Sequence, residues 1–417
     1  MAIVLFIFYF IAGCFLINRL SFIKETGLSR KTILVLFTLK IAAGCILGLV
    51  NHFIFRNLTD YDEFNDWGMY EYRLLISDPK VFFTDIFKSN YADYGEYLGS
   101  SGSYWNDLRA NIIYKCLAFL NIFSRGNYYV NSLLLNFVSF LGHVCLYRVL
   151  KHIYPNKKIE IIIGVFLLPS LLYFSSGIHK DLFVFTALCV FCYALYFSLE
   201  KTFTRRRMIS IVLSFVVILL IRNFIAILLL PCALAWIISK QYGVRPVKVF
   251  TTFLFTGLFA AVLMHFYLPK FDPLKVIVNK QQAFFALGEG STQYKNDTLQ
   301  LTIKSFVHAT PKALRHSFLS PYPGEFINPY TNLFAAEMIL YVILFLLMLL
   351  FPASHDYRSS EFILFGLVFT FLVFLFTGYT ITTAGALVRY RSIYFAFLMV
   401  PVLCHINWQA FKKLSGI

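Results

Sequence analysis

Long apolar runs separated by short basic connections dominate the hydropathy pattern of this chain. Apolar runs of about 15–24 residues are long enough, or nearly so, to cross the hydrocarbon core of a bilayer as helices. We expect such spans near residues 2–17, 32–55, 129–147, 159–175, 182–199, 208–221, 223–238, 249–267, 332–351, 361–378 and 386–405. The pattern therefore predicts an all-α polytopic membrane protein of about 11 transmembrane helices, formed as a single integral-membrane domain over residues 1–417. The shorter apolar stretch 112–123 is expected to be an interfacial helix that lies along the membrane.

Basic residues in the short connections predict the orientation of these spans. With eleven spans, the groups around Arg30, Lys157, Arg206 and Arg245, and the tail with Lys412, all fall on one side of the membrane. Cytoplasmic loops are enriched in lysine and arginine, so this side is expected to be cytoplasmic. The N-terminus is then outside and the C-terminus inside, and the two long loops, 56–128 and 268–331, are extracytoplasmic.

Composition agrees with a membrane protein and explains the net charge. Hydrophobic residues make up 59% of the chain and charged residues 14%, whereas soluble domains carry about 25% charged residues. The formal charge of +16 is accounted for by the cytoplasmic loops, so no nucleic-acid partner is expected. The eight cysteines are scattered through apolar runs and are interpreted as packing thiols, and no metal-binding cluster is expected.

Acidic residues gather at the start of the first long loop. The stretch 57–72, NLTDYDEFNDWGMYEY, follows an apolar span directly and carries Asp60, Asp62, Glu63, Asp66 and Glu71. Single acids such as Glu63, Glu71 or Asp78 are expected to belong to a solvated loop face. The group as a whole supplies candidate catalytic carboxylates, which are Asp60, Asp62 and Asp66.

Further ionisable residues are expected at the same outer boundary. They are His179, Lys180 and Asp181 in FSSGIHKDLF, Arg222 in a tight hairpin, Glu337 near the start of a span, and Arg389 and Arg391 at the start of the last span. Each has a plain structural alternative, as a lipid-head-group anchor or a local pair that caps a helix. Charged residues that border spans nevertheless mark functional sites. Repeated cations on the outer side oppose the orientation bias, and a site that binds a phosphate would explain them.

Carboxylates beside a cationic phosphate site suit a transferase that uses a lipid-phosphate-activated donor. One carboxylate removes a proton from an acceptor hydroxyl, and the cations stabilise the phosphate that leaves. No metal cofactor is required for this chemistry, although an acidic cluster can also hold Mg²⁺ or Mn²⁺.

Four short motifs resemble those of known membrane enzymes. They are Asp60-Tyr61-Asp62-Glu63 followed by Asp66, VRYR with Arg389 and Arg391, PKALRHSFLSPYP at 311–323, and SSGIHKD. With the overall layout, they resemble the integral-membrane glycosyltransferases of the GT-C superfamily and, more loosely, bacterial O-antigen polymerases and ligases. The resemblance implies that Asp60 or Asp62 acts as the base and that Arg389 and Arg391 hold a lipid phosphate. In the family the acidic loop usually follows the first span, whereas here it follows the second.

The leading hypothesis is a glycosyltransferase of the bacterial inner membrane that acts in cell-surface polysaccharide or glycoconjugate assembly. Its partners would be a polyprenyl-phosphate-linked sugar, a saccharide or glycoconjugate acceptor, and the lipid bilayer. A polysaccharide polymerase or ligase is the nearest alternative, and a transporter or flippase for a lipid-linked saccharide is an alternative of another class. Transporters place polar groups at the membrane midplane, on broken helices in repeated halves. The spans read as Leu, Ile, Val and Phe at those positions and no halves repeat, which counts against transport.

Overall fold

The computed structural model describes residues 1–55, 60–89, 102–286, 292–294, 297–326, 329–353 and 359–415, with side chains described throughout these ranges except at 60–62, 329 and 415. Within these ranges the chain is all-helical, at 83% helix and without strands. Two isolated bridges, Gln293 with Thr383 and Pro352 with Ile406, are the only β-type pairings in the described part.

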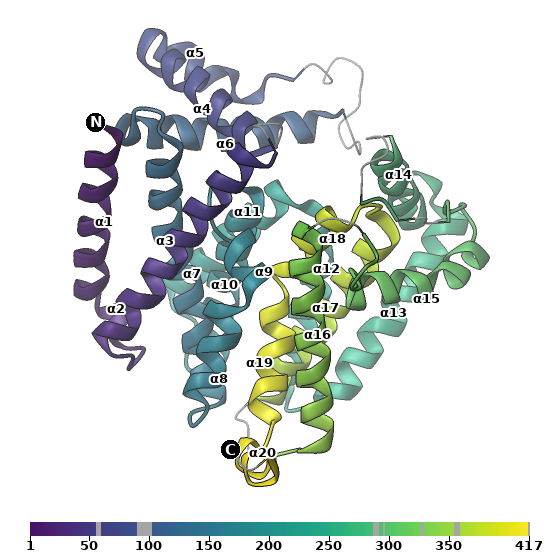
Figure 1. Cartoon of the computed structure of the whole chain (residues 1–417). Coiled ribbons are helices and arrows are strands. Elements are labelled where there is room, and N and C mark those ends of the chain that lie inside the picture. The colour runs from purple at the N-terminus through teal and green to yellow at the C-terminus, as the bar shows by residue number, and fades with distance from the viewer. Residues whose placement is uncertain are drawn as a thin grey trace. The chain divides into compact units, whose positions relative to one another are not determined.

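Eight helices in the described residues are long and apolar enough to cross a membrane. They are α1 (Ala2–Arg19), α3 (Arg30–Phe53), α7 (Tyr128–Ile153), α10 (Lys180–Glu200), α12 (Asn223–Tyr242), α13 (Pro246–Tyr267), α16 (Pro329–Leu350) and α17 (Ser360–Thr380). Figure 1 labels most of them. The prediction of a polytopic helical membrane protein is therefore confirmed at this level.

The other three expected spans are interrupted or short. Residues 386–405 fall in α18 (Ala384–Ser392) and α19 (Phe395–His405), which are bent by 66° at their junction. Residues 208–221 lie in the 17-residue helix α11 (Arg205–Ile221). Residues 159–175 form α8 (Lys158–Ile162), a π-helical segment η3 (Ile163–Leu167) and α9 (Pro169–Phe174). Leu168 is extended because a residue before proline is forced out of the α conformation. The count of eleven spans stays a prediction.

The chain divides into two compact units. The first contains Met1–Arg148, Leu172–Ala194 and Arg205–Asn223, and the second contains Val149–Leu171, Leu195–Thr204 and Phe224–Ile417. This division does not test the prediction of a single domain over residues 1–417, which stays a prediction.

In the first unit, α3 and α7 approach each other closely at Gly44. A Cβ atom at Gly44 would lie 2.3 Å from Nδ2 of Asn136 and 2.6 Å from Oγ of Ser132. Small residues at such contacts let the backbones of membrane helices come together. The absence of a side chain at Gly44 therefore brings the polar residues of α7 directly against α3.

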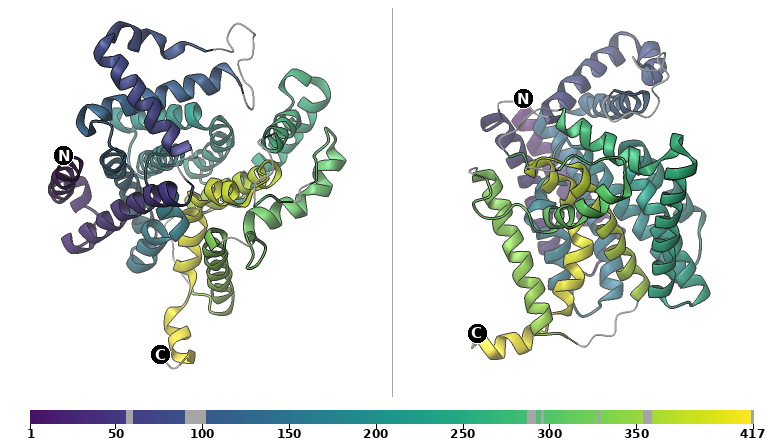
Figure 2. Two further views of the ribbon diagram at one scale, coloured as in Figure 1. Left: turned by 45° about the horizontal axis from the view of Figure 1, so that its top comes forward. Right: turned by 90° about the vertical axis from the view of Figure 1, so that its right-hand side faces the viewer.

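The described residues of the first long loop form a helical layer in the first unit. It consists of α4 (Asp60–Ser77), α5 (Pro79–Thr84), the 3₁₀ turn η1 (Asp85–Phe87) and α6 (Tyr104–Ser124). The short α2 (Ser21–Lys24), between α1 and α3 in the chain, is not part of it. In Figures 1 and 2, α4, α5 and α6 lie together at one end of this unit. The stretch 112–123 is indeed helical, inside α6, and α6 is not among the candidate spans. Its placement along the membrane stays a prediction.

A buried lysine holds this layer together. Lys115 of α6 donates hydrogen bonds to Glu71 of α4 at 2.8 Å and to Asp85 at 2.6 Å, and its ammonium lies 4.2 Å from the centre of the Phe82 ring. Glu71 is only 7% exposed, so the expectation that it is a solvated acid is wrong. Burial of Lys115 demands a partner charge, and Glu71 supplies it. Glu63 and Asp78 are exposed, as expected.

In the second unit, α17 packs against several other helices. They include α13, α19, and the two helices from the second long loop, α14 (Pro273–Phe285) and α15 (Ile303–Leu319). A Cβ atom at Gly378 of α17 would lie 2.2 Å from the carbonyl oxygen of Ala313 in α15, so the two backbones are in contact. The 3₁₀ turn η4 (Pro269–Phe271) links α13 to α14. The last helix, α20 (Trp408–Ser415), lies at the opposite end of this unit from α14 and α15 (Figure 2).

The Lys115 ion pair yields a stability prediction. Replacing Glu71 by Gln leaves the buried ammonium with Asp85 as its remaining carboxylate, and we expect a loss of about 1–3 kcal/mol. Glu63→Gln, at an exposed acid of the same helix, should change stability little. The measurement is the apparent unfolding midpoint of the purified protein in detergent. Equal midpoints for the two variants would show that the pair does not stabilise the layer.

Candidate functional site

The turn between α9 and α10 gathers four of the predicted site residues in the first unit. Arg222, at the junction of α11 and α12, donates to Oδ1 of Asp181, and Nδ1 of His179 lies 2.8 Å from Oδ2 of the same carboxylate. All three side chains are buried. A buried charge requires a partner, and the Arg222 guanidinium supplies one to Asp181. The backbone nitrogen of Asp181 also donates to Nδ1 of His179 at 3.2 Å. Asp181 also lies in the first turn of α10, where the helix dipole favours a negative charge.

Lys180 connects this turn to the acidic helix. Its ammonium lies 4.8 Å from the centre of the Phe64 ring of α4, within the range of a cation–π contact. Phe64 in turn belongs to a hydrophobic cluster that includes Ile178, in the turn, and Leu182, in the first turn of α10. The packing of one aromatic ring thus places the start of α10 against the helix that carries the acidic stretch.

The three candidate carboxylates lie on α4, but only one side chain is described. Asp60 and Asp62 occupy the start of the helix, and their side chains lie outside the described residues. Asp66 is exposed on the same helix. The site therefore combines a neutralising Arg222–Asp181 ion pair, which fixes the turn, with a half-buried lysine beside an acidic helix.

The remaining predicted residues belong to the second unit. Arg391 is 1% exposed, and its Nη1 donates to the carbonyl oxygen of Ser317 at 2.7 Å and to that of His316 at 3.3 Å. These carbonyls belong to the last turn of α15, where a cation is favourable. Arg389 is half-buried, and its guanidinium lies 5.4 Å from the ring centre of Tyr390. A phosphate-binding role for either arginine stays a prediction, and Arg391 also has this structural contact.

Glu337 stabilises the start of the interrupted helix α9. Its Oε1 accepts hydrogen bonds from the backbone nitrogen and the hydroxyl of Ser170, both at 3.0 Å, and from the hydroxyl of Tyr341. The first backbone N–H groups of a helix have no partner within the helix. A buried carboxylate two turns into α16 supplies one here. The predicted role of Glu337 in substrate binding stays a prediction.

Sequence reasoning missed three buried polar residues of the first unit. Lys40 lies in the middle of α3 at 2% exposure, and it donates to both the hydroxyl and the carbonyl oxygen of Ser175. His143 of α7 is fully buried beside the same serine. The interpretation that mid-span positions are only Leu, Ile, Val and Phe is therefore wrong. A lysine inside the apolar run 32–55 was the available signal.

A second missed group surrounds His316 in the second unit. The rings of His316 and Tyr294 stack with centres 4.5 Å apart, and the Tyr294 hydroxyl lies 2.7 Å from Oγ of Ser320. Burial lowers the pKa of His316 and raises the pKa of Tyr294, so both side chains are neutral at pH 7.

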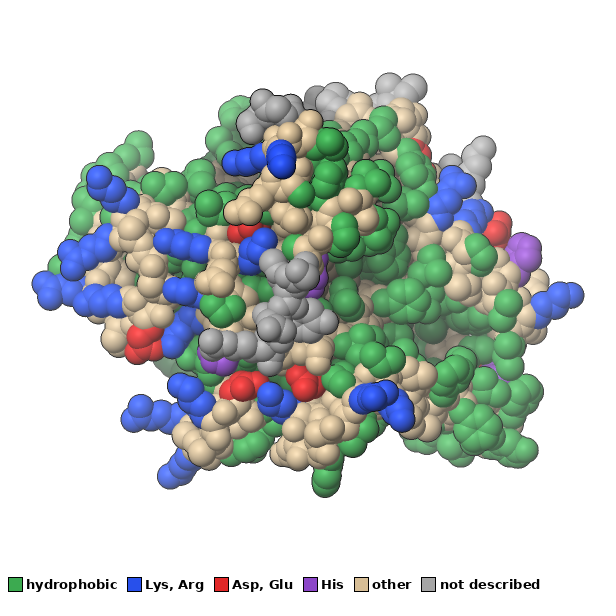
Figure 3. All heavy atoms as spheres, turned by 90° about the horizontal axis from the view of Figure 1, so that it is seen from below, with side chains coloured by type: hydrophobic (Ala, Val, Ile, Leu, Met, Phe, Trp, Pro, Cys, Tyr) green, Lys and Arg blue, Asp and Glu red, His purple; other side chains and the backbone are tan. Residues whose placement is uncertain are grey.

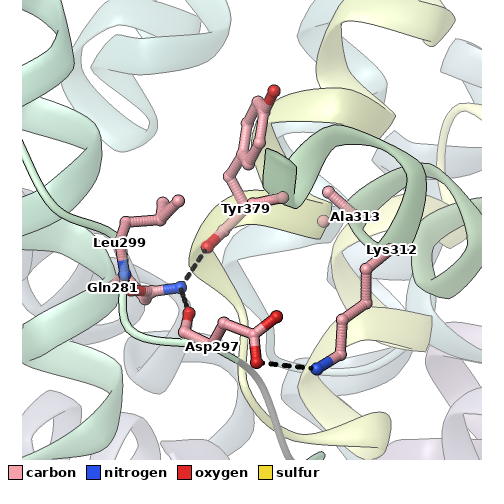
Figure 4. A pocket seen from close by; sticks show the side chains of 8 residues that line it. Gln281, Asp297, Leu299, Lys312, Ala313 and Tyr379 are labelled. Carbon is pink, nitrogen blue, oxygen red and sulfur yellow. Dashed lines mark hydrogen bonds and ion pairs between the residues drawn. The ribbon is translucent and has the colours of Figure 1, made fainter. Parts of the chain in front are cut away.

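Two cavities lie among the described residues of the second unit. One of about 470 Å³ lies among α12, α13 and α17, and its lining is apolar, with Pro231, Gly257 and Leu372 among the residues. A second, of about 20 Å³, is bordered by Gln281, Asp297 and Tyr379 (Figure 4). It has room for about one water molecule. Among the described residues no group of three or more His, Cys, Asp or Glu could hold a metal ion. Metal binding by the loop acids stays a prediction because several of their side chains lie outside the described part.

Comparisons with known proteins do not assign this chain to a family. A scan against models of protein families found no match, and searches of the curated proteins and of the solved structures found none either. The architecture itself establishes a polytopic helical membrane protein.

The buried Asp181 leads to a prediction about the turn. Asp181→Asn keeps the shape but leaves the Arg222 guanidinium buried without its counter-charge, which typically costs about 3–5 kcal/mol. Replacing Arg222 by Met in the same chain should restore part of that loss, whereas Lys180→Met, at the half-buried neighbour, should have a smaller effect. Unfolding midpoints of the single and double variants test this. Additive effects of the two substitutions would contradict the pairing.

His316 predicts a pH dependence of stability. Its pKa in the folded protein is lower than the ordinary value of 6.5. A histidine of this kind contributes stability that is present above its unfolded pKa and is lost as the pH falls toward its folded pKa. The apparent unfolding midpoint should therefore decrease when the pH is lowered from 7.5 to 5.5, and His316→Gln should make that decrease smaller. His308→Gln, at an exposed histidine of the same helix, should leave the slope unchanged. Identical slopes for both variants would contradict the assignment.

Proposed function

We propose that this chain is a membrane-embedded glycosyltransferase. It transfers a sugar from a polyprenyl-phosphate-linked donor to a saccharide or glycoconjugate acceptor, in the assembly of a cell-surface polysaccharide or glycoconjugate. The observation that supports the proposal is the contact of Lys180 with Phe64, which places a cation beside the helix of Asp60, Asp62 and Asp66. Carboxylates next to a cation are the groups that such a transfer needs.

In the proposed reaction the residues of the acidic helix and the cations have separate roles. Asp60 or Asp62, with Asp66 as the third candidate, accepts the proton of the acceptor hydroxyl while that oxygen attacks the anomeric carbon of the donor. Lys180 stabilises the negative charge that develops on the phosphate as the glycosidic bond to it breaks. A phosphate-binding role for Arg389 and Arg391 is proposed from the sequence resemblance alone. Arg222 acts indirectly, because its charge is already balanced by Asp181.

The orientation proposed for the reaction is extracytoplasmic. Many of the side chains seen in Figure 3 are lysines and arginines, and the positive-inside rule expects such side chains on the cytoplasmic side. The N-terminus would then lie outside and the C-terminus in the cytoplasm, in a bacterial inner membrane. A polysaccharide polymerase or ligase would use the same site and would differ in forming longer or preassembled products.

A transporter or flippase for a lipid-linked saccharide is the second candidate. The interruption between α8 and α9, with Glu337 at the helix start, supports it, and so does Lys40 in the middle of a span. Discontinuous helices with polar partners at their ends are typical of transporters. We rank it second because it gives no role to the acidic helix.

The test is sugar transfer by the purified protein in liposomes. Polyprenyl-phosphate monosaccharides labelled in the sugar are the donors, and release of label to a lipid or saccharide acceptor is measured. Asp60→Asn or Asp62→Asn should lower the rate by about 10²–10⁴-fold, the usual contribution of general acid–base catalysis. Glu63→Gln, an exposed acid of the same helix, should retain activity.

Two outcomes would overturn the proposal. Full activity in both Asp60→Asn and Asp62→Asn would show that these carboxylates have no catalytic role. Movement of a fluorescent polyprenyl-diphosphate saccharide across the liposome membrane, without any sugar transfer, would favour the transporter.

A further inference from the structure

We propose that Lys40, Ser175 and His143 form a proton-binding site within the membrane-spanning part of the first unit, in which Lys40 and His143 share one proton through the Ser175 hydroxyl. Ionisable groups inside spans are costly and mark functional sites. This site is separate from the sugar-transfer proposal and does not depend on it.

The geometry defines a direction along the three side chains. Nζ of Lys40 lies 2.6 Å from Oγ of Ser175, and that oxygen lies 3.5 Å from Nε2 of His143, at the outer limit of a hydrogen bond. Nδ1 of His143 lies 2.9 Å from the carbonyl oxygen of Ser139. A carbonyl can only accept, so Nδ1 carries the hydrogen, and Nε2 of the neutral ring is an acceptor. Lys40 therefore donates to Ser175, and Ser175 can donate to His143.

A proton can pass along this chain without any other reactant. An N–H bond of the Lys40 ammonium breaks, and the released proton forms a new O–H bond with Oγ of Ser175. The original O–H bond of Ser175 breaks at the same time, and its proton forms a new N–H bond with Nε2 of His143. Lys40 becomes a neutral amine and His143 an imidazolium, so the net charge of the site is unchanged.

Charge repulsion limits the site to one proton. Two cations separated by a single hydroxyl in a buried environment repel each other strongly, and the two groups titrate as a pair. Among the described residues, the titratable groups that interact electrostatically with Lys40 include His143 and the buried thiol of Cys189 in α10, and Cys189 in turn interacts with the thiols of Cys145 and Cys192. The Phe185 ring of α10 packs on His143 with ring centres 4.5 Å apart.

The position of the proton affects the turn that carries the candidate site. Lys40 also donates to the carbonyl oxygen of Ser175, and Oγ of Ser139 donates to that carbonyl at 3.1 Å. Ser175 follows the end of α9 and precedes His179 and Asp181 in the same turn. A neutral Lys40 donates more weakly than an ammonium. Proton transfer to His143 therefore loosens the contact that holds the start of the turn.

A purely structural Lys40, which only satisfies the Ser175 carbonyl, makes different predictions. Ser175→Ala keeps the carbonyl and removes only the bridging hydroxyl. Ser176→Ala is the matched control, because its buried hydroxyl donates to the backbone carbonyls of Leu172 and Lys40 and not to the side chains of the proposed pair.

The experiment is nitrogen NMR of the full chain in lipid nanodiscs, with histidines labelled with ¹⁵N, His143 assigned through His143→Gln, and pH varied from 8 to 5 without any sugar donor. In the wild type, His143 should remain the neutral Nδ1–H tautomer while Lys40 holds the proton. In Lys40→Met, its proton affinity should rise about tenfold or more because the repelling charge is gone. Ser175→Ala should change the Nε2 resonance, and Ser176→Ala should not.

Identical titration of His143 in the wild type and in Lys40→Met would overturn the proposal and leave Lys40 as a carbonyl partner. If Lys40→Met does not fold, the two serine variants decide. A His143 signal that is the same in Ser175→Ala and Ser176→Ala would overturn the proposal as well. Because no donor is present, these outcomes are independent of the sugar-transfer test.

Discussion

A backbone group that is freed inside a bilayer has no water to bond with, and this constraint governs the interrupted helix at residues 158–174. The backbone N–H of Ser170, at the start of α9, donates to the Glu337 carboxylate in the second unit. The carbonyl of Ser175, just after its end, is satisfied by Lys40 and Ser139 in the first unit. Each end of α9 thus requires a polar or charged side chain from an otherwise apolar span. These side chains are also the ones that could take part in chemistry.

Ion pairing balances several of the buried charges. Asp181 balances Arg222, and Glu71 and Asp85 balance Lys115. Such pairs stabilise a particular arrangement more than they stabilise the fold in total, because desolvation offsets most of their attraction. Lys180 is half-buried and lies against the aromatic ring of Phe64 on the acidic helix. This position, beside the helix of the candidate carboxylates, is the reason that the candidate site is centred on it.

Hydropathy was sufficient for most of the helices, because a run of about 20 apolar residues in lipid has essentially one way to satisfy its backbone. It did not predict the interruption within residues 159–175, next to Pro169, or the buried Lys40, whose charge is averaged away over a long window. The cluster of His179, Lys180, Asp181 and Arg222 could be predicted because all four border spans. The partners of Glu337 and Arg391 could not, since Ser170 and Ser317 are far from them in sequence and look ordinary. Glu71 was misjudged for the same reason, because its partner Lys115 lies on another helix.

The π-helical segment Ile163–Leu167 also constrains how this region can change in evolution. A π turn accommodates one residue more than an α turn, and a single-residue insertion into an α-helix commonly produces it. Here Gly164 gives the segment room, since a Cβ atom at that position would lie 2.3 Å from Cγ2 of Val400. Removing one residue from the segment can therefore be absorbed by a return to regular α-helical geometry, whereas a side chain at Gly164 cannot be absorbed without displacing Val400. The segment thus tolerates a change of length better than a change at its glycine.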